Sequence, residues 1–221
     1  MDKIFFNTSS VHFEKISDPS KSLRSDIRFI SVLFIFIAII ALIIPAFFYE
    51  VVGVRQSSML PTIKEGDKVG ICKVGGFTYG DIVVIYKPAV SRSKYVIKRV
   101  MALEGDEIWL DKDQETGVYY INRIRTINGE RKHEVLKDES YINGPMGHIT
   151  DERFTVREGC IFVLGDNRNN STDSFDYSIF GETPKNAVLG KVITILTKSN
   201  FGVSVGNFNF YWYDTKVISR I

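Results

Sequence analysis

The sequence contains little cysteine and little histidine. Two cysteines, Cys72 and Cys160, are too few for a disulfide framework, and no Cys-x-x-Cys motif occurs. The histidines lie far apart, without the spacing of a metal-binding motif: His12, His133 and His148. We therefore expect no metal and no cofactor. The cysteines lie in predicted strands, where they either pair or remain free thiols as small apolar fillers.

An excess of charge of either sign is also lacking. The 221 residues include 28 Lys+Arg and 26 Asp+Glu, a net charge of +2, so no basic surplus indicates nucleic acid as a partner. Hydrophobic residues make up 44% and charged residues 24%, with a mean hydropathy close to zero. This composition excludes a disordered tail, a collagen-like chain and a polytopic membrane protein. The length allows one domain with a sizeable core, or two small ones.

One segment is nevertheless strongly apolar. From Phe29 to Phe48 no charged residue occurs, and only Ser31 and Pro45 interrupt the apolar run. At about 1.5 Å per residue, such a helix spans the roughly 30 Å of a bilayer core. The alternatives are a buried core helix and a cleaved signal peptide, but a signal peptide has only ~7–15 apolar residues, followed by small ones. Large residues, Phe47-Phe48-Tyr49, follow here, so the segment predicts an uncleaved transmembrane anchor.

Basic residues lie mainly before this anchor. Arg55 alone is basic in the dozen residues after it, whereas four closely precede it: Lys15, Lys21, Arg24 and Arg28. The positive-inside rule then predicts that residues 1–28 are a cytoplasmic tail, that residues 29–48 span the membrane, and that residues 50–221 are exported.

The exported part has β character throughout. Turn signals rich in glycine, aspartate and asparagine separate short stretches rich in Val, Ile and Tyr. These predict strands at Lys68–Val74, Asp81–Tyr86, Tyr95–Leu103, Glu107–Leu110, Val118–Ile121, Cys160–Leu164 and Val188–Thr197. We therefore expect a mainly β fold, an antiparallel sheet or barrel-like domain behind one N-terminal transmembrane helix. Residues 111–158 are more polar than their flanks and are predicted to form an insertion or small subdomain.

A candidate nucleophile lies about ten residues beyond the anchor, in Ser57-Ser58-Met59-Leu60-Pro61-Thr62. A serine hydroxyl is a weak nucleophile unless a base takes its proton. No histidine is a convincing base, because one precedes the anchor and two lie in the polar insertion. A desolvated lysine is the remaining candidate base.

Lys98, in Tyr95–Leu103, fits that requirement. Strand alternation places Lys98 on one face with Val96 and Val100, and an apolar face lowers the pKa of a lysine. Arg99, on the opposite face, cannot serve, because a guanidinium does not deprotonate in this range. Taken alone, each segment also fits a plain structural role, a serine in a turn and a lysine in a strand.

A third segment, Gly165–Ser174, is rich in hydrogen-bonding side chains. A calcium loop is excluded because Arg168 and Tyr177 occupy positions that an EF-hand fills with oxygen ligands. A polar surface loop remains one interpretation, and a loop that supports a catalytic site is the other.

Together, and in this order behind an anchor, these segments resemble the bacterial type I signal peptidases (leader peptidases). The resemblance covers about Val51–Ile195 and rests on SMLPT, GDIVVIYKP, IKRVMALEGD and GDNRNNSTDS. It implies a membrane-anchored Ser/Lys endopeptidase that removes signal peptides from exported preproteins. The implied location is the bacterial cytoplasmic (inner) membrane, with the catalytic domain on its outer, periplasmic face.

The resemblance also implies roles for individual residues. Ser58 is the expected nucleophile, with its amide N–H in the oxyanion hole, and Lys98 is the expected general base. Ser171 is expected to orient the Lys98 amine, and Asp173 to brace that loop. Shallow pockets for small substrate residues are expected to be lined by Met59, Ile63, Ile97, Val52 and Val54, for several of which core packing is an equal alternative.

The chain departs from the family pattern in two places. Gln56 stands where many members have a small or hydroxyl residue that completes the oxyanion hole, and its amide can donate there instead. After Asp173-Ser174 the usual arginine is missing, and Arg168 is the candidate to replace it as the partner of Asp173.

Two other functions compete with general signal-peptide processing. One is a dedicated processing peptidase of a conjugation or pilus system, and the other is a non-catalytic anchored interaction protein with a decayed site.

Overall fold

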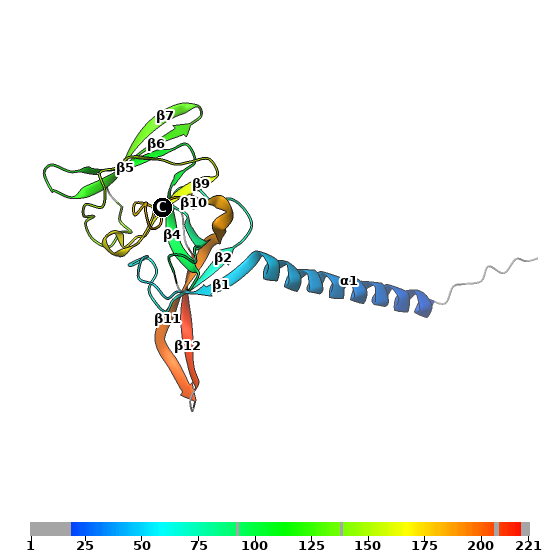
Figure 1. The fold of residues 1–221 in the computed structure, drawn as a ribbon. Coiled ribbons are helices and arrows are strands. Elements are labelled where there is room, and N and C mark those ends of the chain that lie inside the picture. The colour runs from blue at the N-terminus through cyan, green and yellow to red at the C-terminus, as the bar shows by residue number, and fades with distance from the viewer. Residues whose placement is uncertain (1–18, 92, 138, 206–207, 218–221) are drawn as a thin grey trace, which may run out of the picture. The chain divides into compact units, whose positions relative to one another are not determined.

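The computed structural model describes residues 19–91, 93–137, 139–205 and 208–217 (Figure 1). The chain divides into two compact units, Met1–Pro45 and Ala46–Ile221. The long helix α1 spans Pro19–Phe48. Its segment Asp26–Ile43 is long and apolar enough to cross a membrane, and none of that segment is buried. Exposed apolar side chains over such a length are what a lipid-facing helix presents.

Strands of the second unit form two antiparallel sheets. The larger sheet has the order β1-β2-β11-β3-β4-β9-β10, and β12 pairs with β11. Its strands are β1 (Tyr49–Gly53), β2 (Lys68–Cys72), β3 (Ile82–Tyr86), β4 (Tyr95–Leu103), β9 (Cys160–Leu164), β10 (Thr183–Pro184), β11 (Val188–Val205) and β12 (Phe208–Val217). The mainly β, antiparallel fold expected behind one N-terminal apolar helix is confirmed.

The smaller sheet has the order β7-β6-β5-β8. Its strands are β5 (Glu107–Lys112), β6 (Tyr119–Ile127), β7 (Glu130–Leu136) and β8 (Phe154–Thr155). Among its described residues, the unit also has two short 3-10 helices: η1 (Arg168–Asn170) and η2 (Lys185–Ala187). The domain boundaries drawn from the sequence at residues 28, 48, 111 and 158 stay predictions.

The buried core of the described residues forms three apolar clusters. One is formed in part by the segment after β1 and includes Met59, Ile63 and Val69. A second includes Val83 and Val100, and the third gathers around the smaller sheet. Strand β4 contacts these clusters on both faces, so its middle is buried throughout. That is why two neighbouring charged residues of β4 are both removed from solvent.

The two cysteines are free thiols. Both are partly buried, Cys72 at the end of β2 and Cys160 at the start of β9. Of the two interpretations of these residues, the free thiol is the one found.

Candidate active site

Ser58 lies on a tight turn between β1 and β2. The N–H of Leu60 donates to the carbonyl of Ser57 (3.1 Å), and the N–H of Ile63 donates to that of Met59 (2.9 Å). Met59 and Ile63 are fully buried and fix the turn to the core. Ser58 itself is partly buried. Within the described residues its hydroxyl makes no hydrogen bond, so the Oγ is free to react.

The loop after β9 holds the backbone at Ser58. The N–H of Asn167 donates to the carbonyl of Ser58 (3.0 Å), and Asn167 Nδ2 donates to the carbonyl of Ser57 (3.1 Å). Gly165 allows this close approach, because a Cβ there would lie 2.5 Å from the Ser58 carbonyl oxygen and 2.2 Å from Ser171 Oγ. The turn and the loop are therefore packed backbone to backbone.

Lys98 is on β4 and only 2% of its surface is exposed. Its Nζ donates a hydrogen bond to Ser171 Oγ at 2.6 Å. Burial lowers the pKa of Lys98 to about 8, against the opposing effect of the carboxylates of Asp173, Asp176 and Asp166. A lysine with such a pKa has a substantial neutral fraction near neutral pH and can accept a proton.

Asp173 is buried in the same loop. Its carboxylate accepts hydrogen bonds from the N–H groups of Gly165 (3.1 Å) and Phe175 (3.3 Å). Burial raises the pKa of Asp173, against the effect of the nearby Lys98 charge. These contacts tie Asp173 to the residues on either side of Ser171, and its role as a brace for that loop stays a prediction.

The expectation that Arg168 replaces the missing arginine as the partner of Asp173 is wrong. Arg168 forms a bidentate pair with Glu139 instead (2.6 Å for both contacts) and donates from Nε to the carbonyl of Gly165 (3.1 Å). A guanidinium fork pairs with both oxygens of a carboxylate, and Glu139 presents both of its oxygens to Arg168. Backbone N–H groups already occupy the carboxylate of Asp173.

Two hollows meet at Ser58. One, of about 280 Å³, is mainly apolar and is lined by Ser58 together with Val52, Val54, Met59 and Ile97, four of the five predicted pocket residues. Ile63 does not line it, since its side chain is fully buried in the core.

The second hollow, of about 530 Å³, is polar, and Ser58, Lys98 and Ser171 all line it. The structure thus brings together the serine and the lysine that the sequence singled out, from segments 40 residues apart.

Four residues at the apolar hollow were not predicted: Gly53, Arg55, Ser93 and Tyr95. Tyr95 could have been found, because it lies two residues before Ile97 on β4 and so shares its face. Ser93 and Arg55 lie in irregular segments, where no periodicity indicates a direction.

Gln56 lines both hollows, and its side chain is anchored. Its Nε2 donates to Ser91 Oγ at 2.9 Å. An amide nitrogen carries two hydrogens, so Gln56 keeps a second donor, and the residue lines the same hollows as Ser58.

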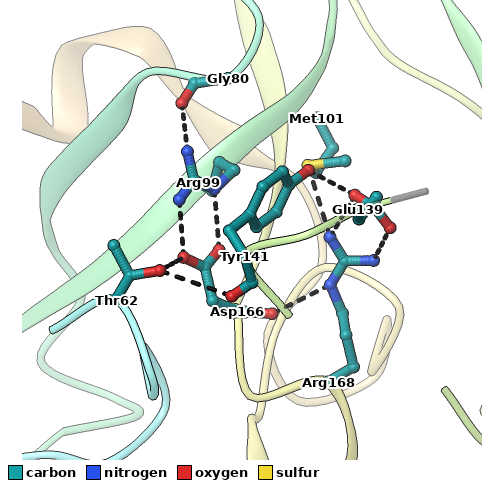
Figure 2. A network of polar contacts seen from close by, with 9 residues as sticks. Thr62, Gly80, Arg99, Met101, Glu139, Tyr141, Asp166 and Arg168 are labelled. Atoms are coloured by element: carbon teal, nitrogen blue, oxygen red, sulfur yellow. Dashed lines mark hydrogen bonds and ion pairs between the residues drawn. The ribbon is translucent and has the colours of Figure 1, made fainter. Parts of the chain in front are cut away.

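Behind the site, Arg99 and Asp166 form a buried ion pair (Figure 2). Arg99 donates from Nε and Nη2 to the two oxygens of Asp166 at 2.8 and 2.6 Å, and from Nη1 to the carbonyl of Gly80. The hydroxyl of Thr62 donates to the same carboxylate at 2.5 Å. The pair thus joins the three segments of the site: β4, the loop after β9 and the turn after Ser58.

Asp166→Asn is expected to lower the free energy of unfolding by about 3–5 kcal/mol, because it leaves the Arg99 charge buried without its counter-ion. Urea unfolding followed by circular dichroism measures this. Asp113→Asn is the matched control, since Asp113 pairs at the surface with Lys137, whose side chain is 52% exposed. Exposed pairs contribute little, so the control is expected to unfold like the wild type. Equal destabilisation by both substitutions would contradict the prediction.

Among the described residues, no group of three or more His, Cys, Asp or Glu side chains is arranged to hold a metal ion.

Comparison with known proteins identifies the family. Residues 27–197 match the family model described as signal peptidase, peptidase S26, which is more than half of the chain. The chain belongs to this signal peptidase family. It is accordingly a serine peptidase.

Curated relatives agree with this assignment. The chain is 36% identical over 147 residues to "Signal peptidase I U" of Bacillus subtilis, which covers 63% of this chain and 72% of the relative. It is 31% identical over 168 residues to "Signal peptidase I" of Bacillus licheniformis, with 73% and 82% covered. "Probable signal peptidase I-1" of Synechocystis is 28% identical over 182 residues, with 78% and 83% covered. These relatives do not favour the conjugation or pilus peptidase, or a non-catalytic anchored protein.

Proposed function

We propose that this peptidase cleaves the signal peptides of exported preproteins with Ser58 as nucleophile and Lys98 as general base. The observation that carries the proposal is that the buried amine of Lys98, its pKa lowered to about 8, lines the same polar hollow as Ser58, whose hydroxyl forms no hydrogen bond within the described residues. Lysine can replace histidine as the base only where its neutral form is populated.

In the proposed reaction, neutral Lys98 takes the proton of Ser58 as the Oγ attacks the carbonyl carbon before the mature protein. Protonated Lys98 then gives that proton to the leaving amine, and the acyl-enzyme forms. Lys98 next activates a water molecule, which releases the signal peptide and restores Ser58. Ser171 holds the amine in place throughout, and Asp173 holds the loop of Ser171.

Two donors are available for the oxyanion of this reaction. The N–H of Ser58 donates to no acceptor among the described residues, and Gln56, whose amide has a second hydrogen, lines the same two hollows as Ser58. We assign both to the oxyanion hole, where donors that point at the developing charge stabilise the transition state.

The apolar hollow is the proposed site for substrate side chains. Its apolar lining, which includes Val52, Val54, Met59 and Ile97, suits small apolar side chains such as alanine at the first and third positions before the scissile bond. Ile63 lies in the same buried cluster as Met59 and supports the hollow indirectly. The same small-x-small preference is implied by the family resemblance.

We further propose that α1 anchors the enzyme in the bacterial cytoplasmic (inner) membrane, with residues 1–28 in the cytoplasm. Support comes from the length and apolar composition of Asp26–Ile43 and from the basic residues that precede it. The partners are then preprotein signal peptides and the lipid bilayer. The near-balanced charge supports the absence of a nucleic-acid partner.

The test is cleavage of a purified preprotein by the full chain in detergent, with the products located by mass spectrometry. The expected result is one cut after an alanine. Changing that alanine to leucine is expected to slow cleavage at least about tenfold, because overfilling a packed site costs ~1–3 kcal/mol.

The matched control is the same change one residue earlier in the substrate. In an extended chain the side chain at that position points away from the hollow. We therefore expect the preprotein with this change to be cleaved at a rate close to that of the unchanged preprotein. Absence of any cut, or equal sensitivity at both positions, would contradict the proposed function.

A further inference from the structure

Glu139 and Arg168 form a second buried ion pair beside the catalytic loop (Figure 2). Their side chains are 6% and 1% exposed, and both guanidinium contacts are 2.6 Å long. Glu139 lies between β7 and β8, in a part of the chain whose sequence shows no catalytic motif. A pair so thoroughly desolvated must hold its geometry, because a broken one leaves a bare buried charge.

Tyr141 links this pair to the first one. Its hydroxyl donates to Glu139, and its ring lies 4.0 Å from the guanidinium carbon of Arg99 and 6.0 Å from that of Arg168. Burial raises the pKa of Tyr141, so its hydroxyl stays protonated and continues to donate. The ring thereby stands between the two arginines, as Figure 2 shows.

The whole segment 139–147 is bound to the loop after β9. The N–H of Asn143 donates to the carbonyl of Asp166 (3.0 Å), and Asn143 Nδ2 donates to Asn167 Oδ1 (3.2 Å). Asn169 accepts from the N–H of Gly147 (2.9 Å) and donates to the carbonyl of Pro145 (2.8 Å). Segment 139–147 therefore fixes the loop along its length.

Two contacts carry this constraint to the reacting groups. Arg168 donates to the carbonyl of Gly165, and the same loop holds Ser58 through the N–H of Asn167. At its other end Ser171 holds the Lys98 amine. Since the loop touches both, its position determines how Ser58 and Lys98 face one another.

We propose that Glu139 is a positioning residue of the peptidase: through Arg168 it holds the loop 165–171 against Ser58 and Lys98. The inference rests on the proposed catalytic roles of Ser58 and Lys98. It gives a role in the reaction to the part of the chain that carries the smaller sheet. No residue of segment 139–147 lines the two hollows at Ser58.

The measurable consequence concerns Lys98. The charged groups that face its amine are the carboxylates of Asp173, Asp176 and Asp166, and the Phe180 ring lies 5.8 Å away. A loosened loop admits water to the amine, which weakens the burial that keeps its pKa low. The apolar hollow does not touch Glu139 and is expected to keep its shape.

The test is Glu139→Gln in the full chain in detergent, with the same preprotein as substrate. We expect kcat to fall at least about tenfold, because a displacement of ~1 Å can cost ~10²-fold, and KM to stay within about twofold. The acid limb of the pH–rate profile is expected to move to higher pH. Titration of ¹³C-labelled lysine by NMR, with Lys98→Met to identify the signal, is expected to show a raised Lys98 pKa.

Glu182→Gln is the matched control. Glu182 is also a buried glutamate paired with an arginine, Arg157, and among the described residues it forms no hydrogen bond or ion pair with loop 165–171. We expect it to leave kcat and the Lys98 titration unchanged, whatever it does to Tm. If Glu139→Gln fails to fold, Tyr141→Phe replaces it, because this change removes only the Tyr141 hydroxyl that donates to Glu139. It is expected to change kcat and the Lys98 pKa in the same direction, but by less.

An unchanged Lys98 titration in folded Glu139→Gln and Tyr141→Phe would overturn the inference. So would a fall in kcat that Glu182→Gln reproduces. The NMR titration needs no turnover, so it tests the inference even if the wild type leaves the preprotein uncut, a result that would contradict the proposed function alone.

Discussion

Ser58→Ala is expected to reduce the rate of signal-peptide cleavage by about 10⁴-fold or more, because removing the nucleophile of a serine peptidase leaves only binding and oxyanion stabilisation. The fold is expected to survive, since the Ser58 hydroxyl bonds to no described residue and its backbone contact with Asn167 is kept. The measurement is the single-turnover rate on a preprotein in detergent, with Tm recorded beside it.

The adjacent serine provides a sharp control. Ser57 precedes Ser58 on the same turn and lines the same polar hollow, and it contacts Asn167 through its carbonyl alone. Ser57→Ala is therefore expected to keep most of the activity. If Ser57→Ala lost activity and Ser58→Ala kept it, Ser57 would be the nucleophile. If both variants stayed active, neither serine would be the nucleophile.

Most strands of the fold were predictable because they combine two local signals. Each predicted stretch, such as Tyr95–Leu103, is rich in Val, Ile and Tyr and is bounded by turn residues. Strand β7 was missed because Glu130–Leu136 is polar and largely exposed. Pairing with β6 and ion pairs such as Arg123–Glu134 stabilise it, and neither is visible in its own sequence.

The proposed catalytic pair was singled out from the sequence for a different reason. Ser58 and Lys98 lie in short motifs whose order matches a known family, and strand alternation alone placed Lys98 among apolar residues. The contacts between segments were not predictable in this way. Glu139 and Arg168 are 29 residues apart, and nothing near either residue indicates the other. The expectation that Arg168 pairs with Asp173 was wrong for the same reason. Only the folded loop shows that backbone N–H groups already donate to the Asp173 carboxylate.

Lys98→Met is expected to lower the cleavage rate by about 10²–10⁴-fold, the usual contribution of a general base. Methionine matches the length of the lysine stem without its amine, so Val96 and Val100 keep their packing. Wild-type activity is expected to rise with pH through about 8, as Lys98 loses its proton. The residual activity of Lys98→Met is expected to lack this step, which a pH–rate profile measures, and a retained step would mean that another group is the base.

The same substitution separates function from stability. In the folded state the pKa of Lys98 is lowered from 10.5 to about 8, so below that pH the folded protein holds a buried charge at a cost of about 3 kcal/mol. Between about pH 8 and 10.5 only the unfolded chain keeps the proton, so stability rises with pH there. Lys98→Met removes this cost, while Asp173 loses the charge that favours its ionised form. Near neutral pH Lys98→Met is therefore expected to be at least as stable as the wild type in urea unfolding, whereas clear destabilisation would mean that Lys98 stabilises the fold.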